Sequence, residues 1–519
     1  MEGYLGMLRA WTVADIARAV RGELPKGLSA DSCITGIFTD SRHPVKGGLF
    51  VPLCGERFNG HNFVEAAFRG GAAISLWSYR EAAVEPSPEF ADQLICVDSV
   101  LTAYLQIAQA HLRRCHTKIA AVTGSVGKTT TKDLLAAILK SKYKAAATVA
   151  NHNNEIGLAQ TLLSLTEDED WAVVEMGMRG RGEIESLAQL TEPNISVVTT
   201  IGESHLERLG TRENIALAKA ELLDWSCPQG TAVLPLDCDF YPLLHSHALN
   251  KTVTFSAEIA PKASVDVDKS RADWQLLQTS EVLARCGESV DGWQRLTFGQ
   301  NIRFACPEGE AELFLPIPGR HNCANLLAAL AAGYEAGVSL EEAISGVASC
   351  AFTGQRLQIE QSADGLTLID DSYNAAPSST RAALDTLAKL PALIVAQTCL
   401  NKDNAQSPVH SDLTPSQPRT VAVLGDMLEL GPAEVDMHRQ VGEYCATCGV
   451  DFLLGVGKLS SSMVEAAQNR GVSTAWAENY EEAFSYINKI IKSGDCLLVK
   501  ASHSMNLSAL AQKIRDNRR

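Results

Sequence analysis

Apolar and polar residues follow two alternating patterns along this chain. Runs of four or five apolar residues predict buried strands, and longer segments with apolar residues at helical spacing separate them. The predicted strands after residue 116 are Ile119–Val122, Trp171–Val174, Ile195–Thr199, Thr231–Leu234, Leu366–Ile369, Thr420–Leu424, Asp451–Gly455 and Cys496–Lys500. Strands that alternate with helices indicate parallel sheets covered by helices, so the predicted fold class is α/β.

The same pattern divides the chain into three predicted domains. Residues 1–116 mix short strands with Gly and Pro turns. Residues 117–351 hold alternating strands and helices, followed by a strand-rich stretch from Lys251 to Pro318. Residues 352–519 resume the alternation, and within them Thr398–Arg419 is polar, contains three prolines and lacks periodicity. That stretch is predicted to be a loop or an insertion.

A glycine-rich motif follows the first strand of the second region. Residues 123–131 read Thr-Gly-Ser-Val-Gly-Lys-Thr-Thr-Thr and open a helical run. A strand, a glycine turn and a helix N-terminus form an anion site, where Lys128 would pair with outer phosphates and Thr129 would bind Mg²⁺. Only two residues separate Gly124 from Gly127, where the common phosphate loop has four, and this disfavours small GTPases and kinases.

Three further candidates follow the phosphate loop. Glu175 comes directly after the strand Trp171–Val174, and an acid at that end of a sheet strand favours a metal ligand. His205 follows the next strand, where it would either face the same crevice or be structural or exposed. Lys219 lies in a helical segment in which most lysines are solvated, so the pattern alone does not select it.

Two segments are rich in asparagine. Asn153 and Asn154 lie in Asn151–Gly157, where side-chain amides would orient phosphate oxygens or a substrate, or would form a turn and a helix cap. Asn322 ends the run Pro318–Asn322 before a helix, where its amide would read an adenine edge or cap the helix.

Composition narrows the functional classes. The chain has 519 residues, enough for two to four domains, and 46% of them are hydrophobic with a mean hydropathy of −0.02. A net charge of −16 disfavours nucleic-acid binding. No basic-apolar leader and no membrane span is expected, and fourteen scattered cysteines indicate free thiols in a cytoplasmic protein. The pair Cys445 and Cys448 lies at helical spacing and is predicted to pack rather than bind zinc.

The order of these motifs resembles that of the Mur ligases, which are ATP-dependent amide-forming enzymes of peptidoglycan synthesis. The resemblance covers nearly the whole chain and extends to Asp370–Pro377. The run Val423–Gly431 is similar to the signature of one member, and the segments Asp40–Arg42 and Gly55–His61 fit its uridine-nucleotide domain. The Asp-Asn-Pro-Arg selector of the tripeptide-forming member is not found.

The resemblance implies a monomeric enzyme with a uridine-nucleotide domain, a central ATP-binding domain and a C-terminal Rossmann-like domain. Its implied ligands are ATP, Mg²⁺, UDP-N-acetylmuramoyl-tripeptide and D-alanyl-D-alanine. The implied catalytic residues are Lys128, Glu175, His205 and Lys219; the metal ligands are Thr129, Glu175, His205 and a CO2-derived carbamate on Lys219. The implied ATP-binding residues are Gly124, Ser125, Gly127, Lys128, Thr129, Thr130, Asn322, Arg356 and Asp371. The implied substrate-binding residues are Thr39, Asp40, Ser41, Arg42, Asn153, Asn154, Tyr373 and Asn374.

One segment departs from the family pattern. Residues 499–505 read Val-Lys-Ala-Ser-His-Ser-Met in place of the usual Lys-Gly-Ser-Arg-x-Met, which changes the residues at Ala501 and His503. Three alternatives stay open: a tripeptide-forming Mur ligase, a folylpolyglutamate synthetase, and an inactive nucleotide-binding homologue that serves as an interaction protein. The intact Lys128 and Glu175 argue against the last of these.

Overall fold

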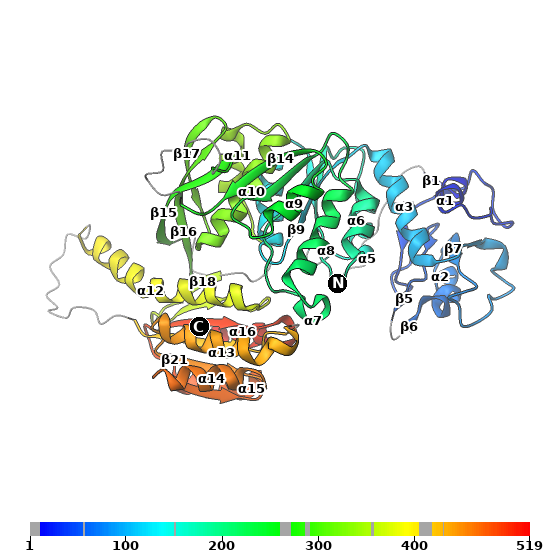
Figure 1. Ribbon diagram of the computed structural model, residues 1–519. Helices are drawn as coiled ribbons and strands as arrows, with labels where there is room; N and C mark the ends of the chain where they lie inside the picture. The colour runs from blue at the N-terminus through cyan, green and yellow to red at the C-terminus, as the bar shows by residue number, and fades with distance from the viewer. Residues whose placement is uncertain are drawn as a thin grey trace.

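The computed structural model describes residues 11–55, 58–149, 152–259, 271–285, 291–353, 358–403, 418–428 and 430–518. Helices cover large parallel and mixed sheets throughout, so the predicted α/β class is confirmed (Figure 1). None of the helices in these ranges is long and apolar enough to cross a membrane.

The N-terminal part is built on a small parallel sheet in the order β3-β4-β7-β8. Its elements are β1 (Trp11–Thr12), α1 (Val13–Val20), β2 (Cys33–Ile34), β3 (Ile37–Phe38), β4 (Leu49–Phe50), β5 (Cys54–Gly55), β6 (Phe58–Asn59), α2 (Val64–Arg69), β7 (Ile74–Trp77), β8 (Leu94–Cys96) and α3 (Val100–Cys115). The long helix α3 also packs on α5 and α6, so it joins this part to the core of the central part.

The central part is a parallel sheet in the order β10-β11-β9-β12-β13-β14. Its strands are β9 (Lys118–Thr123), β10 (Ala145–Ala147), β11 (Trp171–Glu175), β12 (Ile195–Val198), β13 (Thr231–Pro235) and β14 (Lys251–Ser256). Its helices are α4 (Lys128–Lys140), α5 (Glu155–Leu163), α6 (Glu183–Thr191), α7 (Leu206–Leu209), α8 (Arg212–Asp224), α9 (Tyr241–His247), α10 (Arg320–Glu335) and α11 (Leu340–Ala348).

Alternate residues of β9 explain why both faces of this sheet are covered. Ile119 and Ala121 belong to a core with α3, α5, α6 and α8, whereas Ala120 and Val122 belong to a core with α4, α10 and α11. Side chains alternate along a strand, so an entirely apolar strand needs a helix layer on each side. This sandwich places the C-terminal end of β9, and the glycine turn after it, at the open edge of the sheet.

Antiparallel strands extend the central sheet into the C-terminal part. They are β15 (Trp274–Arg285), β16 (Trp293–Cys306), β17 (Gly309–Leu315) and β18 (Gln358–Ser362), and β16 pairs with the other three. The strand-rich prediction for Lys251–Pro318 is therefore confirmed. The ladder continues through β18 to β19, so one sheet runs through both parts.

The C-terminal part is a parallel sheet in the order β19-β23-β20-β21-β22. Its elements are β19 (Thr367–Asp370), α12 (Pro377–Asp403), β20 (Thr420–Gly425), η3 (Gly431–Ala433), α13 (Glu434–Thr447), β21 (Phe452–Val456), α14 (Ser460–Asn469), β22 (Ser473–Ala477), α15 (Tyr480–Ile490), β23 (Cys496–Lys500), η4 (His503–Met505) and α16 (Leu507–Asn517). Helices α12, α13 and α14 cover one face, and α15 and α16 cover the other.

One element prediction is wrong in part. Residues Thr398–Asp403 are helical because α12 continues through them, although they were expected to lie in a loop. A helix that already exists gains one hydrogen bond for each added residue, and no proline interrupts this stretch before Pro408. Residues 404–417 lie outside the described ranges. Packing of Cys445 is confirmed: the side chain is buried in α13, and burial raises the pKa of its thiol to about 12.

Candidate active site

The glycine turn between β9 and α4 has the geometry of a phosphate loop. Gly124 has φ +149° and Gly127 has φ +90°, which L side chains rarely adopt. A Cβ on Gly127 would lie 2.1 Å from Asn325 Oδ1, so glycine is also required by the close approach of α10. No side chain of the described residues caps the first turn of α4, and its N–H groups and dipole face the turn. The Lys128 Nζ lies across the glycine turn and donates to the Gly124 carbonyl at 2.8 Å.

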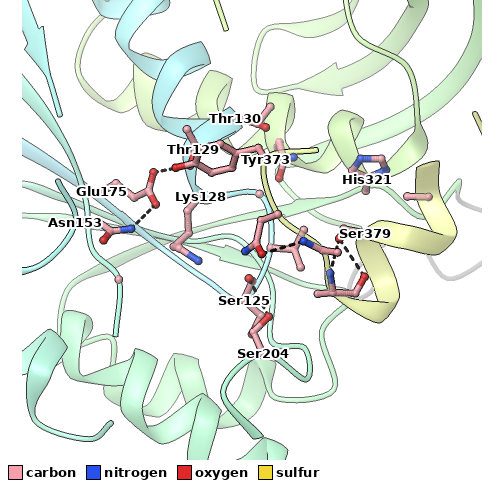
Figure 2. Close-up of a pocket in the computed structure, with 18 of the residues that line it drawn as sticks. Ser125, Lys128, Thr129, Thr130, Asn153, Glu175, Ser204, His321, Tyr373 and Ser379 are labelled. Atoms are coloured by element: carbon pink, nitrogen blue, oxygen red, sulfur yellow. Dashed lines mark hydrogen bonds between the residues drawn. The ribbon is translucent and has the colours of Figure 1, made fainter. Parts of the chain in front are cut away.

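Glu175 connects the phosphate loop to the asparagine-rich segment. Its Oε2 accepts a hydrogen bond from the Thr129 hydroxyl at 2.6 Å, and its Oε1 accepts one from the Asn153 amide at 3.0 Å (Figure 2). The side chain is buried at the end of β11, which pairs in register with β9. A buried carboxylate beside a hydroxyl suits a hard cation with oxygen ligands. Asn154 caps α5 through the Gly157 N–H, so here the helix-cap interpretation is confirmed.

His205 and Lys219 lie on the other side of the phosphate loop. His205 has φ +69° and forms the N-cap of α7, and Lys219 lies in the middle of α8 with 1% of its surface exposed. Burial, and then the charge of Lys128, lowers the pKa of Lys219 well below its ordinary value. Burial, together with nearby positive charges, lowers the pKa of His205 to about 3. His205 is therefore uncharged near neutral pH, and burial disfavours the charged form of Lys219. The expectation that a lysine in this helix is solvated does not hold.

The opposite wall of the site comes from α10 and the C-terminal part. The Asn322 amide donates to the Pro318 carbonyl at 2.6 Å, and the Asn325 amide donates to Asn322 Oδ1 at 3.0 Å. The Lys500 Nζ, nearly fully buried, donates to Asp371 Oδ2 at 2.6 Å and to the Asn374 carbonyl at 2.7 Å. This ion pair fixes the loop that carries Tyr373 after β19. The ring of Tyr373 also lies 5.8 Å from the ring of His503, at the position where the sequence departs from the family.

These walls enclose a cavity of about 590 Å³. Residues from the phosphate loop, from β11, from α10 and from the start of α12 line it together (Figure 2). The predicted residues that line it are Ser125, Gly127, Lys128, Thr129, Thr130, Asn153, Asn154, Glu175, His205, Asn322, Asp371, Tyr373 and Asn374. Lys219 and Gly124 lie behind this surface, and Arg356 and Asn151 lie outside the described residues.

The predicted uridine-nucleotide residues do not line this cavity. Thr39, Asp40 and Ser41 follow β3 in the N-terminal part, half-buried, and Arg42 is exposed. The Arg42 guanidinium donates to Asp40 Oδ2 at 2.7 Å and holds the pKa of that carboxyl well below its usual range. This loop therefore offers a charged surface of its own, which belongs to the part of the chain drawn in blue in Figure 1.

The cavity also contains residues that the sequence analysis did not select. His321 and Asn325 come from the first turns of α10, and Lys500 comes from the end of β23. Burial lowers the pKa of His321 to about 4. His321 lies in the motif Pro318–Asn322, and Lys500 lies in residues 499–505, the segment that departs from the family pattern. The position of each residue within a motif was therefore the signal by which the sequence could have identified it as a site residue.

Known protein families and structures match the chain along its length. Residues 122–333 match the Mur ligase middle domain, and residues 409–503 match the Mur ligase glutamate ligase domain. A Bacillus subtilis protein is 34% identical over 505 residues, which cover 97% of this chain and 98% of that protein. An Escherichia coli protein is 30% identical over 98% of both chains. The crystal structure of MurF from Acinetobacter baumannii superposes with a TM-score of 0.79 at 26% identity, covering 98% of this chain and 100% of that one.

The short phosphate loop, the cavity and these full-length matches define the class: the chain belongs to the Mur ligase family. The resemblance predicted from the motifs is thus confirmed. The Bacillus subtilis and Escherichia coli relatives both carry the name UDP-N-acetylmuramoyl-tripeptide–D-alanyl-D-alanine ligase.

Proposed function

We propose that this protein is the ATP-dependent ligase that joins D-alanyl-D-alanine to UDP-N-acetylmuramoyl-tripeptide in peptidoglycan precursor synthesis. The observation that carries the proposal is the cavity in which the phosphate loop faces Asp371, Tyr373 and Asn374. An amide-forming ligase has to bring a nucleotide, a carboxylate and an amine into one enclosed space, and this cavity is bounded by both a nucleotide-binding turn and a second wall.

The chemistry requires activation of a carboxylate, which is a poor electrophile. The tripeptide carboxylate oxygen attacks the γ-phosphorus of ATP, the bond from that phosphorus to the β,γ-bridging oxygen breaks, and ADP leaves. The dipeptide amine then attacks the acyl phosphate carbon; phosphate leaves and the amine loses a proton. Lys128 and the N–H groups of α4 would neutralise the phosphates, so positioning and charge stabilisation supply most of the catalysis.

The residues present fit Mg²⁺ if the nucleotide supplies further oxygens. Among the described residues, no group of three or more His, Cys, Asp and Glu side chains lies close enough to hold a metal alone. Thr129, Glu175 and His205 would therefore share the ions with phosphate oxygens. Bound Mg²⁺ would neutralise charge that develops on the transferred phosphoryl group.

Lys219 fits a carbamate for a separate reason. The side chain is buried, with 1% of its surface exposed, and burial lowers the pKa of its amine well below the ordinary value. A neutral amine is the form that attacks CO2: the C–N bond forms, one proton is released and a carboxylate-like group remains. We infer that this group would replace a buried amine with an anion within electrostatic reach of Lys128.

Three domains suit three ligands. We assign residues 1–116 to the uridine-nucleotide substrate, 117–351 to ATP and 352–519 to the incoming dipeptide, with Thr39, Asp40, Ser41 and Arg42 on the first. We further propose that the enzyme is a cytoplasmic monomer and that Asn322, Arg356 and Asp371 contact ATP. The absent Asp-Asn-Pro-Arg selector and the named full-length relatives favour this function over the tripeptide-forming ligase and the folylpolyglutamate synthetase.

The decisive experiment is phosphate release from ATP and Mg²⁺ with the UDP-linked tripeptide, with and without D-alanyl-D-alanine. We expect release that depends on both substrates and a matching pentapeptide product, and we expect Lys128→Ala to abolish it while the fold is retained. Release with the UDP-linked dipeptide and a free diamino acid would assign the chain to the neighbouring ligase. Nucleotide binding without turnover under any condition would support the inactive homologue.

A further inference from the structure

The turn after β20 is held in place by its own domain. Asp426 accepts a hydrogen bond at 2.7 Å from the N–H of Ser460, the first residue of α14. The Met427 N–H donates to His438 Nε2 at 2.9 Å, and the Leu428 N–H donates to Ser502 Oγ at 3.0 Å. Three elements of the C-terminal part therefore fix this turn, and the sequence run that resembled a family signature is explained here by structural bonds rather than by contact with a ligand.

The far end of the same turn touches the central part. Gly431 begins η3, which contacts α7. Gly431 has φ +62°, and a Cβ placed on it would lie 2.8 Å from Glu207 Cα and 3.0 Å from Glu207 Cβ. The first of these atoms is backbone, so any larger residue would have to displace α7. Glycine at position 431 is thus what allows the two parts to meet at this distance.

The segment that ends in α7 is bonded to the phosphate loop on its other side. The Gly202 N–H donates to Ser125 Oγ at 2.9 Å, and the Thr199 hydroxyl donates to the Val126 carbonyl at 2.6 Å. His205 lies between these bonds and Glu207, at the start of α7 and with φ +69°. Its position is therefore bounded by the phosphate loop on one side and by Gly431 on the other.

We propose that Gly431 is a positioning residue: its backbone contact with Glu207 sets the position of α7 and thereby of His205 in the catalytic cavity. The proposal rests on the metal-binding role of His205 proposed above. Under this proposal the contact between η3 and α7 affects catalysis, because the metal site is complete only when the C-terminal part packs against α7. A displacement of about 1 Å at such a group costs roughly 100-fold in rate.

The test is Gly431→Ala with Gly449→Ala as its matched control. Gly449 lies in the same part of the chain at φ +68°, and a Cβ there meets nothing within 4 Å. Both variants carry the same backbone strain, and only the first pushes on α7. We expect kcat of Gly431→Ala to fall roughly 10- to 100-fold relative to Gly449→Ala, with a higher Mg²⁺ requirement and an unchanged KM for the UDP-linked tripeptide.

A readout without turnover separates this proposal from the proposed function. Amide hydrogen exchange over residues 203–210 should become faster in Gly431→Ala alone, in the absence of any substrate. Ser502→Ala removes the acceptor of the Leu428 N–H without adding bulk, and it should give the same direction of change if Gly431→Ala does not fold. Equal exchange, equal kcat and equal Mg²⁺ dependence in Gly431→Ala and Gly449→Ala would overturn the positioning role. An inactive wild type with altered exchange in Gly431→Ala would instead overturn the proposed function.

Discussion

Individual residues in this site are defined by what surrounds them rather than by their type. Glu175 and Lys219 are both buried and both ionisable, yet Glu175 accepts two hydrogen bonds, whereas burial lowers the pKa of Lys219 well below its ordinary value. Burial disfavours the charged form of an amine, so the lysine is the group set up for covalent modification. The position of Lys219 in a helix gave no hint of this.

The carbamate on Lys219 leads to the first prediction. Wild-type protein in carbon-13 bicarbonate should show a carbamate carbonyl resonance, because only an uncharged amine adds CO2 and the pKa of Lys219 lies well below its ordinary value. Lys219→Ala should lose both the resonance and turnover. Lys144→Ala removes an exposed lysine and should keep both. A resonance that persists in Lys219→Ala would show that the carbamate forms elsewhere.

A second prediction concerns pH and His321. Burial lowers the folded-state pKa of this imidazole to about 4, below its ordinary value of 6.5. Between these values the unfolded chain binds a proton that the folded chain does not, so stability is fully present above pH 6.5 and is lost as the pH falls toward 4. His321→Gln should reduce the slope of the unfolding free energy in this window by up to ~1.4 kcal/mol per pH unit, measured by urea denaturation. His245→Gln, at an exposed position, should leave the slope unchanged.

At the scale of secondary-structure elements, helix α4 is held in place at two points in its first half. Its N-terminus forms the phosphate loop, and Asp133 one turn later accepts the Thr353 N–H at 2.7 Å and the Thr353 hydroxyl at 2.8 Å. Lys132 pairs with Asp133 at 2.9 Å, and both side chains are buried. The chain that leaves α11 is therefore tied to the nucleotide-binding helix.

The third prediction tests this anchor with Thr353→Val. The substitution keeps the shape but removes the hydroxyl that Asp133 accepts from, which leaves a buried carboxylate less satisfied. We expect a loss of about 1–3 kcal/mol in the free energy of unfolding, measured by urea denaturation. Thr353→Ser retains the hydroxyl and should recover most of the lost free energy of unfolding. Equal stability of the Val and Ser variants would show that the backbone N–H alone holds the segment.

At the scale of the whole molecule, the central and C-terminal parts share one sheet and together line the cavity, whereas the N-terminal part has sheets of its own. A nucleotide on the phosphate loop would touch both parts through Asp371 and Tyr373, which line the same cavity as Lys128. Binding there should therefore order two segments that are far apart in sequence.

The fourth prediction follows at this scale. ADP with Mg²⁺ at a hundredfold excess over its Kd should stabilise the protein by ~2.7 kcal/mol and raise the melting temperature by roughly 2–3 °C, because the unfolding entropy scales with the length of the chain. Hydrogen exchange should slow at residues 371–379 as well as in the phosphate loop. Lys128→Ala should lose the shift, and Lys140→Ala, at the exposed end of the same helix, should keep it. Protection confined to the phosphate loop would mean that the nucleotide contacts the central part alone.

Local sequence pattern predicted the α/β class, four strands of the central sheet and the phosphate loop, whereas the short edge strand β10 was missed. These are local: an apolar run such as Ile119–Val122 needs two covering layers wherever it lies, and a glycine turn before a helix makes an anion site from its own N–H groups. Glu175 was found for the same reason, because the end of a strand next to the loop is fixed by register.

The remaining features follow from tertiary contacts. The burial of Lys219, the pairing of Lys500 with Asp371 across 129 positions and the contact of Gly431 with Glu207 depend on segments that are distant in the chain. The continuation of α12 through Thr398–Asp403 is likewise set by a helix that begins far upstream. The local sequence pattern indicates which side chains of a segment have to be buried. Tertiary packing determines which charge, hydroxyl or backbone atom from a distant segment contacts them.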